Sequence, residues 1–76
     1  MNPNLLSQEQ ALSIIELAKV EKLLTGGSLG SIMQKHLSLK QLSNVVLDPK
    51  KDFFYLDGEE AINMFMKYCV QQEEKS

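Results

Sequence analysis

Two side chains of this chain are suited to nucleophilic, acid–base or metal chemistry: its single histidine, His36, and its single cysteine, Cys69. A thiolate activated by an imidazole is a nucleophile, and either side chain can bind a metal if further ligands stand at matching spacing. The sequence neither pairs the two residues nor offers such ligands. We therefore expect a hydrogen-bonded His36 at the margin of the core, and a packed Cys69 thiol in a reducing compartment.

Two further groups of residues resemble chemical motifs. Glu59 and Glu60 are adjacent carboxylates, but neighbours on a helix point about 100° apart and do not face one substrate. The run Gly26-Gly27-Ser28-Leu29-Gly30 is glycine-rich at a helix start, yet it lacks the lysine of a phosphate-binding loop. We expect Glu59 and Glu60 to stabilise the start of a helix, and the glycine-rich run to form a turn between two helices. The sequence predicts no catalytic residue, no cofactor and no metal, so the chain is not expected to be an enzyme.

Length and charge limit the classes of protein that fit. The 76 residues are expected to form one domain, residues 1–76, with frayed ends at about 1–6 and 71–76. The net charge is -2, and all eight basic residues are lysines, whereas arginine is preferred for bidentate contacts to phosphate and guanine. No secretory signal or apolar run of bilayer length is visible, so we expect a cytoplasmic protein that does not enter a membrane.

The first helix is expected over residues 8–24. Ser7 and Gln10 form the pattern of a capping box, and Gly26 is suited to the left-handed conformation that ends a helix. A helix that is apolar all round is usually central to a bundle or buried against a second chain. The apolar residues spread almost around the whole circumference: Ala11, Leu12, Ile14, Ile15, Leu17, Ala18, Val20, Leu23 and Leu24.

Two short helices are expected in the middle of the chain. One begins at Ser28 or Leu29, and its apolar stripe leaves Gly30, Ser31, Gln34 and Lys35 on the opposite side. The stripe consists of Leu29, Ile32, Met33, His36 and Leu37. The next has Ser38 as its cap and ends before Pro49. Its expected buried residues are Leu39, Leu42, Val45 and Val46.

The C-terminal third is expected to hold a short extended segment and a last helix. The aromatic run at residues 53–56 favours an extended conformation. Asp57 should cap the helix, with Glu60 as its capping-box partner. Met64 falls outside the expected inner face, which is Ala61, Ile62, Phe65, Met66 and Cys69. The fold class is therefore all-α, a small bundle of three to four helices with a short extended segment before the last one.

The apolar residues exceed what such short helices can hide from water. Exposed methionine and aromatic surface is typical of adaptable interfaces. We therefore expect a non-catalytic protein–protein interaction module, a small self-associating regulator or adaptor that forms a homo-oligomer and binds a protein partner. The expected contact residues are Leu12, Ile15, Val20, Leu23, Phe53, Phe54, Tyr55 and Met64.

An alternative is a DNA-binding regulator that resembles a helix-turn-helix protein. The two short helices at 29–37 and 39–46 have that spacing, and the second would present polar side chains to a major groove. These are Lys40, Gln41, Ser43 and Asn44. Against it, the connection at residues 36–38 lacks the glycine common in such turns, and few cations flank it. Nucleic acid is therefore the less favoured partner.

Overall fold

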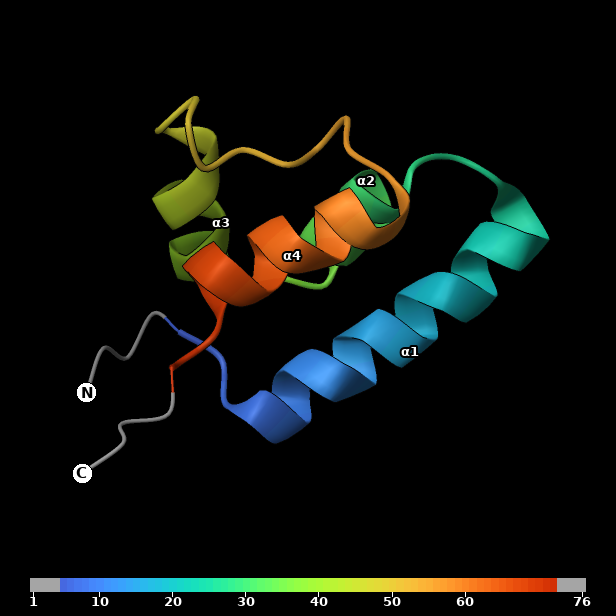
Figure 1. Ribbon diagram of the computed structural model, residues 1–76, viewed down its shortest axis with the longest axis horizontal. Helices are drawn as coiled ribbons and strands as arrows, with labels where there is room; N and C mark the ends of the chain where they lie inside the picture. Colours follow the sequence, from blue (N-terminus) through green and yellow to red (C-terminus); the bar gives the residue numbers. More distant parts are fainter. Residues whose placement is uncertain (1–4, 73–76) are drawn as a thin grey trace.

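The computed structural model describes residues 5–72, which fold into four helices packed as a small all-α bundle. They are α1 (Gln8–Thr25), α2 (Leu29–Lys35), α3 (Leu39–Val46) and α4 (Gly58–Cys69). The described residues contain no β-strand, and none of these helices is long and apolar enough to cross a membrane. The predicted fold class is confirmed. In Figure 1, α1 runs along the lower side of the molecule, and α2, α3 and α4 lie above it.

The ends of α1 are set by local contacts. The Ser7 hydroxyl accepts a hydrogen bond from the Gln10 N–H, and the Gln10 side chain accepts one from the Ser7 N–H, which completes the predicted capping box. At the other end, Gly26 has a φ of 77°, a region that residues with a Cβ rarely adopt, and its N–H donates to the Lys22 carbonyl at 2.9 Å. The helix therefore ends at Thr25, one residue beyond the predicted end.

The predicted starts of the two short helices and the end of α3 are confirmed, whereas α2 ends at Lys35, two residues before its predicted end. Ser28 caps α2, and Ser38 forms a capping box with Gln41 at the start of α3. The predicted faces are partly wrong, because Gly30 and Gln34 of α2 are buried rather than exposed. The Gly30 N–H donates to the Leu56 carbonyl at 3.0 Å, so the segment that precedes α4 covers this side of α2.

Residues 53–56 form a turn and do not pair as a strand. The Leu56 N–H donates to the Phe53 carbonyl at 3.0 Å, and the Phe54 N–H donates to the Asp52 carboxylate at 2.9 Å. Phe53 points inward and meets Phe65 edge to face, with ring centroids 5.9 Å apart. Phe54 and Tyr55 remain exposed. Because Phe53 is completely buried, its expected role as a contact residue is wrong.

The last helix begins at the predicted place but without its predicted box. Asp57 caps α4 by accepting a hydrogen bond from the Gly58 N–H at 2.9 Å, whereas no hydrogen bond joins Glu60 to this cap. The buried face carries Ala61, Phe65 and Cys69. Met64 is half-buried and packs against the core, so it is less exposed than the sequence predicts.

The first and last described segments lie side by side (Figure 1). Leu6 and Val70 form a parallel bridge, in which the Leu6 N–H donates to the Cys69 carbonyl and the Gln71 N–H to the Leu6 carbonyl, both at 2.8 Å. Leu6 is also part of the buried core. The expected fraying therefore does not extend to Leu6 or Gln71. For residues 1–4 and 73–76 the expectation lies outside the described residues.

Candidate functional site

The inner face of α1 is narrow. Ala11, Ile15 and Ala18, spaced i, i+4 and i+7, are the buried residues of this helix. Two of the three carry only a methyl group, which allows close packing of the helix on the bundle. The expected role of Ile15 as a contact residue is wrong, because its side chain lies in the core.

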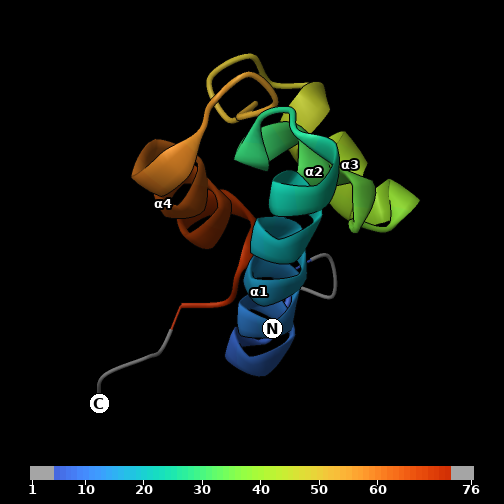
Figure 2. The ribbon, with the colours of Figure 1, turned by 90° about the vertical axis from the view of Figure 1, so that its right-hand side faces the viewer.

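The outer face of α1 is defined here as its five exposed large apolar residues. Their exposed fractions run from 53% at Val20 to 87% at Leu23. Figure 2 shows α1 at the front of the molecule, with α4 to its left and α2 and α3 to its right and behind it. An extended exposed apolar surface on a small domain typically marks a contact site. The outer face consists of Leu12, Leu17, Val20, Leu23 and Leu24.

A groove adjoins this outer face, between the second half of α1 and the start of α4. Leu23 forms one wall, and the buried Leu29 and half-buried Ile62 contribute apolar surface. The polar lining comes from Lys19, Lys22 and Glu59, together with Gly58. The groove and the outer face therefore form one mixed surface, largely apolar and edged by charges.

One carboxylate holds the two walls of this groove together. Asp57 forms an ion pair with Lys22 of α1 and accepts a hydrogen bond from the Leu29 N–H at 3.0 Å. The Lys22 ammonium, with the backbone N–H groups of Leu29 and Gly58, lowers the Asp57 pKa from 3.8 to about 2. The sequence indicated only the helix cap, because the two other partners come from distant segments.

Further exposed apolar residues lie on α3, directly after it and in the 53–56 turn, and we call this set the α3 patch. Leu39 is 84% exposed and Val46 is 44% exposed, so the prediction that both are buried is wrong. A groove beside Val46 is lined by Lys35, Leu42 and Phe54, among others. The patch consists of Leu39, Val46, Leu47, Phe54 and Tyr55.

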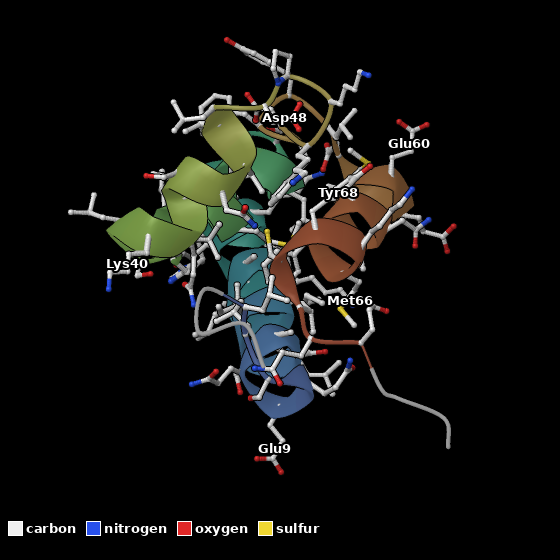
Figure 3. The ribbon with its side chains drawn as sticks, turned by 90° about the vertical axis from the view of Figure 1, so that its left-hand side faces the viewer. Glu9, Lys40, Asp48, Glu60, Met66 and Tyr68 are labelled. Carbon is white, nitrogen blue, oxygen red and sulfur yellow. The ribbon has the colours of Figure 1, made fainter. Side chains whose placement is uncertain are left out.

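The residues of the DNA-binding alternative do not form a free polar row. Lys40 projects from α3 into solvent (Figure 3). Gln41 is engaged in the cap of α3, and the Ser43 hydroxyl donates to the Leu39 carbonyl at 2.8 Å. Asn44 turns toward α4 and donates to the Tyr68 carbonyl at 3.4 Å. Three of the four side chains thus form hydrogen bonds within the domain itself.

His36 and Cys69, the two residues suited to chemistry, are both engaged in contacts within the domain. His36 Nε2 lies 2.7 Å from Glu21 Oε1 in a partly buried contact between α1 and the end of α2. Cys69 is buried, and desolvation raises its pKa to about 12. Among the described residues no three histidine, cysteine or acidic side chains are grouped as a metal site would need. Both residues therefore have the structural surroundings that the sequence predicts.

The fold and this surface define a small all-α domain with an unpaired apolar helix face. No protein-family model, curated protein or solved structure matches the chain.

Proposed function

We propose that this chain is a non-catalytic protein-interaction module, a small regulator or adaptor that self-associates through the outer face of α1. The observation that supports this most is the exposure of five large apolar side chains on one helix whose opposite side is already packed. Water contact with so much apolar surface is unfavourable, and contact with a second protein removes it.

The size of this surface implies a weak interaction. Full burial of a leucine or valine side chain contributes about 1.5–3 kcal/mol, whereas association costs about 4–15 kcal/mol. A few such side chains from each of two chains exceed this cost only modestly. We therefore expect a reversible complex in the micromolar range, which suits a regulator that exchanges partners.

The α3 patch supplies a second contact for a protein partner. Leu39 and Tyr55 are 84% and 88% exposed, and Phe54 lines the groove next to Val46. This patch replaces Phe53 and Met64 of the sequence prediction, because those two side chains pack on the core. An adaptor needs two such surfaces, one for its own kind and one for its partner.

Sedimentation equilibrium from about 10 µM to about 1 mM tests self-association. The wild-type chain should pass from monomer to a larger species over this range. A variant with glutamine at Leu12, Leu17, Leu23 and Leu24 should remain monomeric, since glutamine keeps helix propensity but removes the apolar contact. A control with glutamine at Leu39 and Leu47 should behave as wild type. A wild-type chain that stays monomeric throughout contradicts the proposal.

DNA binding through α3 is the alternative, and it has less support. Only Lys40 of its four proposed contacts is an exposed cation. Such a function predicts duplex affinity at low salt that weakens as salt rises and is lost in Lys40→Ala. Detection of that affinity would favour the alternative over the protein-interaction module.

A further inference from the structure

Four exposed residues of α1 form a row that is complementary to itself. Leu12, Glu16, Lys19 and Leu23 follow one another at i, i+4, i+7 and i+11, so they lie along one line of the helix surface. The row reads apolar, acidic, basic, apolar. When a second copy runs in the opposite direction, each leucine meets the other leucine and each charge meets its opposite. When it runs in the same direction, Glu16 meets Glu16 and Lys19 meets Lys19.

We propose that two copies of this chain associate through antiparallel α1 helices about a two-fold axis that crosses the row midway between Glu16 and Lys19. Leu12 of each copy packs on Leu23 of the other, and Glu16 of each copy pairs with Lys19 of the other. This geometry rests on the proposed function and specifies its self-association. The two-fold axis makes the interface isologous, so it closes as a dimer rather than growing into a filament.

The groove beside Leu23 accommodates the side chain of Leu12 from the second copy. Its apolar lining includes Leu29 and Ile62, and Lys19 lies at its edge. Leu12 of the second copy reaches this groove because it lies opposite Leu23. The ion pair between Lys22 and Asp57 fixes α4 against α1, so the groove exists before association.

The two charges of the row are not engaged in ion pairs among the residues that the structure describes. Glu16 and Lys19 are both exposed, and neither forms an ion pair with another residue in the described range 5–72. Exposed ion pairs add little affinity, but opposed like charges are unfavourable. Glu16 and Lys19 therefore decide the direction of the second helix, while Leu12 and Leu23 supply the contact. Leu17 and Leu24 lie farther around α1 and outside the row.

Charge reversal tests the pairing. Glu16→Lys alone and Lys19→Glu alone should each weaken the homodimer at least about tenfold, because each places like charges opposite one another. A mixture of the two variants should form a heterodimer close to wild-type affinity, and so should the double variant with itself. All these positions are exposed, so circular dichroism should report an unchanged fold. If the mixture is no tighter than the single variants, the proposed pairing is overturned.

Cysteine cross-linking tests the direction. A mixture of Leu12→Cys and Leu23→Cys chains should form an interchain disulfide on mild oxidation, whereas neither variant should do so alone. In the antiparallel arrangement the two copies of residue 12 stand about 16 Å apart along the axis, beyond the reach of a disulfide. Cys69 is buried and does not compete. Cross-linking of Leu12→Cys with itself indicates a parallel pair and overturns the proposal.

The outcomes separate this inference from the proposed function. If the wild-type chain is monomeric at all concentrations, both fail. If it self-associates, and Leu17→Gln with Leu24→Gln dissociates it while the charge reversals leave it unchanged, the proposed function stands and the antiparallel geometry is wrong. If Leu12→Gln with Leu23→Gln dissociates it and the charge-reversed mixture recovers, both are supported.

Discussion

The side chains of Lys22 and Asp57 form an ion pair that joins the end of α1 to the start of α4. The same carboxylate accepts hydrogen bonds from the N–H groups of Leu29 and Gly58, at 3.0 and 2.9 Å. One side chain therefore connects the ends of three helices: α1, α2 and α4. Its partners Lys22, Leu29 and Gly58 all line the groove that adjoins the outer face of α1.

This connection predicts a loss of stability in acid. The Asp57 pKa is lowered from 3.8 to about 2, so the ionised carboxylate is stabilised more in the native state than in the unfolded state. Its contribution is present above pH 4 and is lost as the pH falls from about 4 to about 2. In Asp57→Asn, the free energy of unfolding should fall less steeply over this window, as measured by urea denaturation at several pH values.

Lys22→Met is the matched variant for this effect. It removes the largest cause of the lowered Asp57 pKa but keeps the carboxylate and its two backbone partners. The NMR titration of the Asp57 carboxyl carbon should then show a midpoint above that of wild type. An unchanged midpoint would mean that the ion pair does not form in solution.

Gly30 should not tolerate a side chain. A Cβ built on Gly30 would overlap the Phe53 carbonyl oxygen and lie 2.8 Å from the Leu56 carbonyl oxygen, both of which are backbone atoms. Gly30→Ala should therefore lower the free energy of unfolding by about 3 kcal/mol or more. Gly58→Ala is the control, since Gly58 has a φ of 60° but open space around it, and should cost about 1–2 kcal/mol. Equal losses for both variants would contradict the close approach at Gly30.

The thiol of Cys69 should be inert in the folded protein. Its side chain is buried, and its pKa is raised to about 12 by desolvation, so little reactive thiolate exists at neutral pH. Ellman's reagent should react slowly with the native chain and rapidly after unfolding in guanidinium. Reaction of the native chain at the rate of a free thiol would place Cys69 at the surface.

The outer face of α1 should contribute little to the stability of one chain. Leu17→Gln or Leu24→Gln should change the free energy of unfolding by no more than about 0.5 kcal/mol at concentrations where the chain is monomeric. Ile15→Gln on the same helix should cost about 3 kcal/mol, because it buries an amide in the core. Thermal denaturation at low concentration compares the three variants, and a large loss in Leu17→Gln would show that this face is packed.

The starts of the helices were predictable because each depends on neighbours in the sequence. Ser7 and Ser38 each cap a helix through a hydrogen bond to a residue three positions on, and Gly26 ends α1 with its own backbone angle. Asp57 was predicted as a cap as well, and it accepts its hydrogen bond from the next residue, Gly58. A contact that spans three residues is visible in the sequence itself.

The covered side of each helix was less predictable, because it depends on segments that are distant in the chain. Phe53, Phe54 and Tyr55 are similar in type, yet only Phe53 meets Phe65 in the core. Gly30 lies opposite the apolar stripe of α2, and it is buried because the 53–56 turn crosses it. Leu39 looks like a core residue of α3 but remains exposed, since no described segment passes over it.

The central claim is that the outer face of α1 is a contact surface for a second copy of the chain. An NMR dilution series with amide and methyl resonances measures this directly, residue by residue. We predict concentration-dependent shifts at Leu12, Val20 and Leu23 and none at Leu39 or Leu47. Resonances of α1 that do not change on dilution, or shifts that appear at α3 instead, would contradict it.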